Sequence, residues 1–424
     1  MNNGMKKTLA AAMLCAVVAA SAFADKIGWT SLMQAAQKND TAEVMRLIAA
    51  GEDVNVKSDL YSVTALMYVA QNNAVDAVKA LIAAGANVNA KDKYGENALR
   101  YAAVSNAADA AKVLVAAGAE MDFYSAAYLN NTDAVLRFIK TGTNVNAKDK
   151  YGLTALMFAA KVNAVETIKT LIAASTNVNA KDDEGKTALM YAAQSNAADT
   201  AKALIAAKAD ANAKTERGKT VLMFAASANS AEVARVLIES GADVNAKDNN
   251  DWTALWYATQ NNSADAAKQL IAAGADVKAT NRYGETMLML AANNNSADAA
   301  KVLIAAGANV NAQTSEYKKT ALMFASGANS LDVAKVLIAA GADVNAQTPI
   351  GYEAGGETAL IFAAKNKAAD VAKLLIAAGA NVNKQSFNRT PLTAAIYSEA
   401  WEVAKLLIEA KADVNKRAEG YSWD

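Results

Sequence analysis

The chain is poor in the residues that most often carry chemistry or cross-links. Its 424 residues include no His, one Cys and two Pro. Without His, and with Cys15 in a segment that we expect to be removed, the usual general base and thiol nucleophile are absent. A framework of disulfides is excluded for the same reason. We therefore expect no catalytic residue, no metal and no cofactor, and a fold stabilised by packing alone.

An excess of charge of either sign is also missing, because 42 basic residues balance 42 acidic ones. A chain without a basic surplus has no general attraction for a polyanion, so we do not expect nucleic acid as a partner. A hydrolase built on two carboxylates is the remaining catalytic alternative. It would need a carboxylate pair that departs from the repeat described below, and the sequence shows none.

The first residues read as a targeting segment. Lys6 and Lys7 precede an apolar run at 9–20, which is too short to span a membrane. Ala22-Phe23-Ala24 then fits the small-x-small rule, which predicts cleavage between Ala24 and Asp25. We expect residues 1–24 to be a bacterial-type signal peptide, the product to be periplasmic or secreted, and no membrane insertion after cleavage. An uncleaved anchor is the alternative.

The rest of the chain repeats itself with a period of about 33 residues, and self-similarity at such a period is the signature of a solenoid. The segment Thr187–Ala193 returns as Thr220–Ala226, and the segment Leu81–Ala90 returns as Leu303–Ala312. Twelve units follow, with first helices anchored at Leu32, Leu66, Leu99, Phe123, Leu156, Leu189, Leu222, Leu255, Leu288, Leu322, Leu360 and Leu392.

The T-x-L opening, the Ala-Ala pair and the G-A-D/N-V-N-A ending resemble the ankyrin repeat over residues 25–417. The resemblance implies an all-α solenoid of about twelve helix-turn-helix units with β-turn fingers, and a monomeric scaffold whose partner is a protein. One departure is the Met that most units carry where the family has a His. Thr390-Pro391-Leu392 is the only intact T-P-L.

Local signals agree with this architecture. Each opening Thr is placed to cap its first helix. Ten units end the first helix at an Asn, which adopts the left-handed conformation more readily than other non-glycine residues. These are Asn39, Asn73, Asn106, Asn130, Asn163, Asn196, Asn229, Asn262, Asn295 and Asn329. The repeated Met position, for example Met157, is expected in the core rather than at a copper site.

Two steps break the period. The step from Leu99 to Phe123 is shorter than the others, so a finger is missing at Gly118–Asp122. We therefore divide the chain into residues 25–120 (repeats 1–3), 121–417 (repeats 4–12) and a tail at 418–424, and expect the junction to be the weakest point of the array. Conversely, residues 348–356 form a lengthened finger.

Large aromatic residues recur in the fingers, three residues before the opening Thr or its equivalent Asn97. In the family this stretch is exposed, and aromatic residues in loops favour binding. Packing between neighbouring fingers is the alternative. The predicted anchors are Tyr61, Tyr94, Tyr151, Tyr283, Tyr317 and Phe387, with Trp252 in a finger where the sequence offers no core.

The resemblance also places a polar groove just after each Ala-Ala pair. Uncharged amides and hydroxyls dominate there, which suits a partner held by hydrogen bonds. The predicted groove residues are Gln71, Asn72, Gln194, Ser195, Gln260, Asn261, Asn293 and Asn294. The expected function is an exported interaction scaffold, and a secreted effector that binds a host or competitor target is the alternative.

Overall fold

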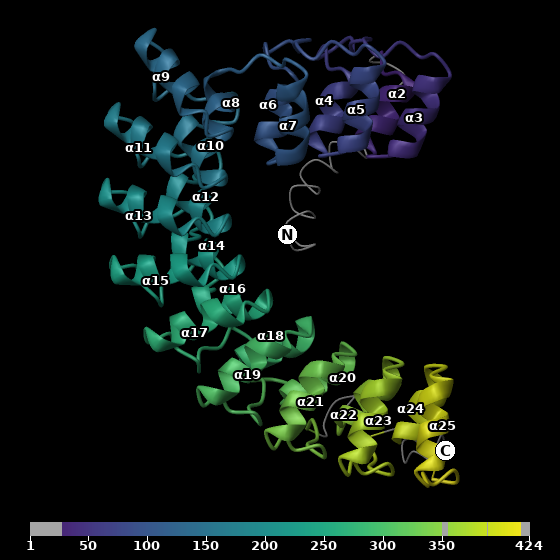
Figure 1. The fold of residues 1–424 in the computed structure, drawn as a ribbon. Helices are drawn as coiled ribbons and strands as arrows, with labels where there is room; N and C mark the ends of the chain where they lie inside the picture. The colour runs from purple at the N-terminus through teal and green to yellow at the C-terminus, as the bar shows by residue number, and fades with distance from the viewer. Residues whose placement is uncertain (1–27, 350–354, 388, 417–424) are drawn as a thin grey trace. The chain divides into compact units, whose positions relative to one another are not determined.

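The computed structural model describes residues 28–349, 355–387 and 389–416. The predicted signal peptide 1–24, its cleavage site at Ala24 and Asp25, and the tail 418–424 lie outside the described residues. Within them the chain forms 24 helices and no strand, arranged as twelve pairs (Figure 1). All twelve predicted anchors lie in the first helix of a pair, so the all-α repeat architecture is confirmed.

The chain divides into two compact units between Asp210 and Ala211. In the first unit, which holds repeats 1–6, the first helices are α2 (Ser31–Gln37), α4 (Ala65–Gln71), α6 (Ala98–Val104), α8 (Phe123–Tyr128), α10 (Ala155–Lys161) and α12 (Ala188–Gln194). The second helices are α3 (Thr41–Ala49), α5 (Val75–Ala83), α7 (Ala108–Ala116), α9 (Thr132–Lys140), α11 (Val165–Ala173) and α13 (Ala198–Ala206).

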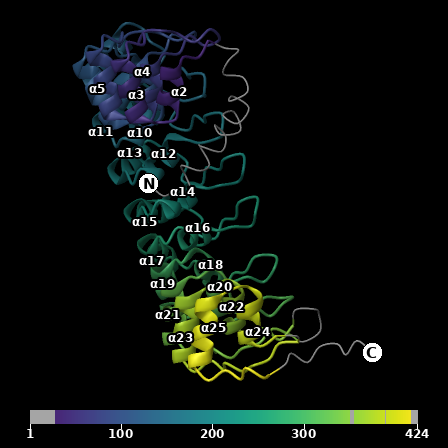
Figure 2. The ribbon, with the colours of Figure 1, turned by 90° about the vertical axis from the view of Figure 1, so that its right-hand side faces the viewer.

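The second unit holds repeats 7–12. Its first helices are α14 (Val221–Ser227), α16 (Ala254–Gln260), α18 (Met287–Asn294), α20 (Ala321–Gly327), α22 (Ala359–Lys365) and α24 (Pro391–Tyr397). Its second helices are α15 (Ala231–Glu239), α17 (Ala264–Ala272), α19 (Ala297–Ala305), α21 (Leu331–Ala339), α23 (Ala369–Ala377) and α25 (Trp401–Glu409). Figure 2 shows the finger loops beside α14, α16 and α18 projecting from one side of the stack.

The anchor position and the Met position form the core of most repeats. Leu156 and Met157 are both fully buried, as are Leu189 and Met190 in the next repeat. Thr154 caps α10 by accepting from the Met157 N–H, and its own N–H points at the Met157 sulfur at 3.4 Å. The thioether is a weak acceptor. The Met therefore packs the core and still keeps a polar link to the start of the helix.

The Asn that ends each first helix adopts the predicted left-handed conformation in all ten units, with φ between 51° and 60°. Its side chain also reaches the next repeat. The Asn73 Oδ1 accepts a hydrogen bond of 2.9 Å from the Ala110 N–H at the start of α7, and Asn229 and Asn262 make the equivalent bonds. A Gly would adopt the conformation but lacks this acceptor, which gives a physical reason for Asn here.

A second ladder of asparagines joins neighbouring repeats after seven of the second helices. Asn212 donates from Nδ2 to the Gly241 carbonyl at 3.0 Å and accepts at Oδ1 from the Asp243 N–H at 2.8 Å. One amide thus satisfies two backbone groups that follow the neighbouring helix. Asn55, Asn89, Asn179, Asn245, Asn311 and Asn345 act in the same way.

The missing finger lies where the sequence placed it, because only residues 117–122 separate α7 from α8. We call the loop before the first helix of repeat n finger n, so finger 4 is absent. In finger 5, Gly152 has a φ of 74°, and a Cβ there would lie 2.7 Å from the Asp183 backbone nitrogen of finger 6. Gly95 in finger 3 has no such neighbour within 4 Å, because the loop that would cover it is missing.

Candidate interaction site

Six of the seven predicted finger aromatics are exposed. The exposed fractions of Tyr61, Tyr94, Tyr151, Tyr283, Tyr317 and Phe387 lie between 39% and 58%. Trp252 is different, because it is half-buried. Its ring stacks on Trp256 at 6.0 Å and meets the edge of Tyr257 at 5.7 Å. The expectation that no core surrounds Trp252 was wrong, since repeat 8 supplies Trp256 where most repeats carry Met.

Lysine ammonium groups lie against the rings of the exposed tyrosines of the first unit. The Lys93 Nζ lies 4.0 Å from the centre of the Tyr61 ring and 5.2 Å from that of Tyr94. The Lys150 Nζ lies 4.3 Å from the Tyr94 ring and 5.2 Å from the Tyr151 ring. Cations at these distances are attracted by the ring quadrupole. Fingers 2, 3 and 5 therefore present an alternating row of tyrosine and lysine, which we call the tyrosine row.

The predicted groove residues lie at the ends of the first helices, and several serve those helices. Asn72 donates to the Ala36 carbonyl of the preceding repeat at 2.9 Å. Asn261 and Asn294 each donate to a carbonyl four residues earlier, at 2.9 Å. The Ala36 and Tyr257 carbonyls already accept a backbone N–H, so these amides add a second hydrogen bond at the end of the helix. Gln71, Gln194 and Gln260 are half-buried, whereas Ser195 and Asn293 are exposed.

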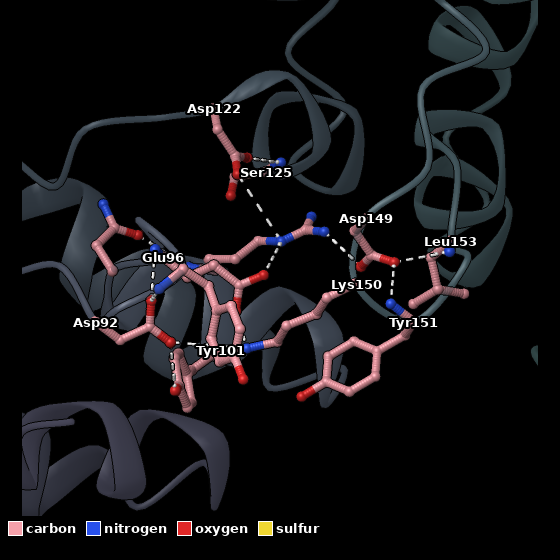
Figure 3. Close-up of polar contacts among 12 residues, drawn as sticks. Asp92, Glu96, Tyr101, Asp122, Ser125, Asp149, Lys150, Tyr151 and Leu153 are labelled. Atoms are coloured by element: carbon pink, nitrogen blue, oxygen red, sulfur yellow. Dashed lines mark hydrogen bonds and ion pairs between the residues drawn. The ribbon is translucent and has the colours of Figure 1, made fainter. Parts of the chain in front are cut away.

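Sequence reasoning missed a buried charge cluster beside the tyrosine row. Arg100 stands at the Met position of repeat 3 and is 1% exposed. Its Nη2 contacts the Asp149 Oδ2 of finger 5 at 2.6 Å. Its Nε lies 3.7 Å from Glu96 Oε1 and 3.8 Å from Asp122 Oδ2 (Figure 3). One guanidinium thus links repeat 3 to the finger of repeat 5.

Two aromatic rings enclose the same guanidinium. The Arg100 Cζ lies 4.2 Å from the centre of the Tyr124 ring and 4.2 Å from that of Phe158. The planar group is therefore sandwiched, which arginine tolerates better than lysine does. Its Nη1 is buried and has no hydrogen-bond partner within the described residues. The cluster stabilises the charge with rings and carboxylates, and it leaves one guanidinium nitrogen, Nη1, unsatisfied.

Lys150 completes this bridge from the other side. Its Nζ lies 2.7 Å from Glu96 Oε2 and 3.6 Å from Asp92 Oδ2 (Figure 3). Repeat 3 and finger 5 are therefore joined by ion pairs in both directions, with a cation contributed by each side. Four carboxylates gather here, and the sequence analysis, which found no carboxylate pair that departs from the repeat, did not predict this cluster. Each carboxylate lies within ion-pair distance of Arg100 or Lys150, which suits an ion-pair cluster.

The pairing of Asp149 with Arg100 has a cause that the sequence contains. In three repeats the finger Asp accepts from a Tyr hydroxyl nine residues later, in the pairs Asp92–Tyr101, Asp182–Tyr191 and Asp248–Tyr257. Repeat 5 has Phe158 at that position, so no phenol reaches Asp149. Its Oδ2 accepts from Arg100 instead. Two features of the sequence could have predicted this ion pair. Asp149 is followed nine residues later by Phe instead of Tyr, and Arg100 stands at a position where most repeats have Met.

Burial sets the protonation of several neighbouring groups. Desolvation lowers the pKa of Lys161 to about 8, and the nearby Arg100 acts in the same direction. The Lys161 Nζ lies 3.3 Å from the Val104 carbonyl, which again links repeat 5 to repeat 3. Desolvation raises the pKa of Tyr101 and Tyr191, and the hydrogen bond of each phenol to its finger Asp raises it further.

The described residues hold no group of three or more His, Cys, Asp and Glu side chains arranged to bind a metal. In the same part of the chain, every helix is too short or too polar to cross a membrane.

Comparison with known proteins identifies the class. A family described as ankyrin repeats (3 copies) matches residues 32–125, 123–215, 196–281, 261–348 and 350–418. The chain therefore belongs to the ankyrin-repeat family. No curated protein matches it. Among solved structures, the human ASB11 ankyrin repeat domain is 23% identical, with a TM-score of 0.48, over 53% of this chain and 99% of that one.

Proposed function

We propose that this chain is an exported scaffold that binds a protein partner through the tyrosine row. Ankyrin repeats indicate an interaction scaffold. The observation that selects the fingers is that Tyr61, Tyr94 and Tyr151 are exposed while lysines hold their rings in place. Rings that are already ordered lose little entropy when a partner covers them. Tyrosine is also among the residues that contribute most to protein interfaces.

The test compares exposed rings with a packed one. A partner is captured from a periplasmic extract with residues 25–424 and purified, and its affinity is then measured for Tyr94→Ala, Tyr151→Ala and Trp252→Ala. A hot-spot tyrosine contributes about 2 kcal/mol, so each Tyr variant is expected to bind at least tenfold more weakly while its melting temperature stays unchanged. Trp252→Ala is expected to lower the melting temperature, because it removes the packing on Trp256.

The groove gives the competing location. If the Tyr variants keep full affinity while Gln194→Ala and Asn293→Ala lose it, the partner binds the polar groove and the finger proposal is wrong. If the Tyr variants melt earlier by as much as Trp252→Ala, the rings serve packing between fingers.

Export is proposed from the segment 1–24 alone. N-terminal sequencing of the protein isolated from its native cell is expected to begin at Asp25, and a start at Met1 or Met5 would contradict it. Release by osmotic shock would place the protein in the periplasm, whereas recovery from the medium would favour the secreted effector.

A further inference from the structure

Helix α9 of repeat 4 leaves a core position partly exposed. In the other eleven second helices the same position is Leu, with an exposed fraction of 5% or less. Repeat 4 has Phe138 there, and it is half-buried, covered on one side by Phe123 at 5.9 Å between ring centres. A large apolar side chain at a core position is normally buried, so something that covers this position in the other repeats is missing.

The missing cover is the preceding second helix. In Figure 1, α9 lies at one end of a row with α11 and α13, whereas α3, α5 and α7 form a separate row. Helix α9 packs against α11, as α3 packs against α5 and α5 against α7, but α7 and α9 do not pack in this way. The shortened connection at 117–122 separates them. The face of α9 that a regular predecessor would cover is therefore left open.

A cavity of about 340 Å³ occupies this face. It is lined by Met121, Ala134, Arg137, Phe138 and Thr141. The lining surface is mostly apolar. The hollow is open to solvent, unlike the clefts that enclose small ligands, so it suits a surface partner better. The cavity thus offers an apolar floor with one cation at its edge.

The charges around the cavity also depart from the repeat. Ten second helices carry Lys or Arg at the position where α9 has Leu136, which is 38% exposed. The next residue, Arg137, and Lys140 one turn later are basic, and neither forms an ion pair within the described residues. Most other second helices pair their exposed cation with an acid three residues earlier, as Lys169 does with Glu166. Repeat 4 therefore presents apolar surface flanked by two unpaired cations.

We propose that this face of α9 binds an amphipathic helix of a partner protein, with an acidic residue of that helix placed against Arg137. A helix is the occupant because a helix covers the equivalent face in the regular repeats. An acid is expected because Arg137 and Lys140 lack one. The site lies on a second helix and uses no finger residue, so it is independent of the tyrosine row and of the function proposed for it.

The probe is a fluorescein-labelled peptide of residues 164–174, held helical by a staple on its solvent side. This segment is a second helix of the stack and carries Glu166, the acid to be placed against Arg137. Fluorescence anisotropy with residues 25–424 is expected to show saturable binding. Leu136→Lys combined with Arg137→Ala restores the pattern of repeat 2 and is expected to weaken binding at least tenfold without changing the circular dichroism.

A charge exchange and a matched control test whether the peptide binds at this face of α9. Arg137→Glu is expected to reject this peptide and to bind its Glu166→Lys version. Lys169→Leu with Thr170→Arg copies the α9 pair onto α11, whose equivalent face is covered, and should bind no better than the wild type. Tyr94→Ala should bind the peptide normally, which separates this site from the fingers. Absence of binding, or equal binding by the Leu136→Lys/Arg137→Ala variant, overturns the proposal. So does a dimer in light scattering that this variant abolishes, because a second copy would then be the occupant.

Discussion

Arg100 and Asp149 form a buried ion pair of 2.6 Å although 49 residues separate them in the chain. The pair exists because finger 4 is absent, which lets finger 5 approach repeat 3. Arg100 fills the space with a long side chain where most repeats have Met. The irregular junction is therefore a repacked interface with its own contacts.

Replacing Arg100 with Met is expected to destabilise the first unit. The change introduces the residue that most repeats have but leaves Asp149, whose side chain is 3% exposed, without its cation. Removing one partner of a buried pair costs about 3–5 kcal/mol. Urea denaturation followed by circular dichroism measures the loss. Arg100→Met with Asp149→Thr, which copies the Thr215 and Phe224 combination of repeat 7, should recover most of it. Equal loss in both variants would show that the carboxylate is not the cause.

Limited proteolysis tests the strength of the same junction. Because α7 and α9 do not pack as neighbouring second helices do elsewhere, a broad-specificity protease is expected to cut near residues 118–125 before it cuts regular fingers. In Arg100→Met the cut should come earlier still, since the ion pair between helix α6 and finger 5 is lost. First cleavage within 348–356 would show that exposure of the long finger matters more. Mass spectrometry of the fragments decides between them.

The asparagine that ends each first helix can be tested against glycine. Asn73→Gly keeps the left-handed conformation but removes the hydrogen bond to the Ala110 N–H. A net loss of about 1 kcal/mol is expected for one such bond. Asn73→Ala should cost more, because it adds backbone strain at a φ of 55°. The melting temperatures of the two variants show which of them is less stable. If Asn73→Gly is neutral or stabilising, the side-chain bond contributes nothing.

Lys161 makes stability depend on pH in a defined window. Its pKa is about 8 in the folded chain and about 10.4 in an unfolded one. Between these values the unfolded state binds more protons, so this group makes stability rise with pH and leaves a constant penalty below pH 8. Lys161→Met is therefore expected to be more stable than the wild type at pH 7, by roughly 1–3 kcal/mol. The advantage should shrink from pH 8 to pH 10.

The pH range in which Lys161 controls the change in stability ends where the tyrosines begin to titrate. The raised pKa values of Tyr101 and Tyr191 mean that the unfolded state ionises first above about pH 10, so stability falls there in both proteins. Melting curves at pH 7, 8.5 and 9.5 avoid this region. A constant difference between variant and wild type across the three values would contradict the lowered pKa of Lys161.

The amino-acid sequence by itself determined the regular features of this protein. Twelve helix pairs, the buried Met row and the left-handed Asn at the end of ten first helices all follow from residues within one repeat or its copy. The missing finger could also be read, as a shortened step between Leu99 and Phe123. Such features depend on local capping, backbone conformation and period, which a linear sequence states directly.

Only the tertiary structure decided how the irregular positions are satisfied. That Arg100 meets Asp149, that Trp252 packs on Trp256, and that Phe138 faces an open cavity depend on which repeats approach one another. A deletion in the sequence of a solenoid does not determine whether the neighbouring repeats close the gap, side chains fill it, or it stays open to solvent. That outcome is set by side-chain length, burial and charge across the junction, and these act between residues that the sequence places far apart.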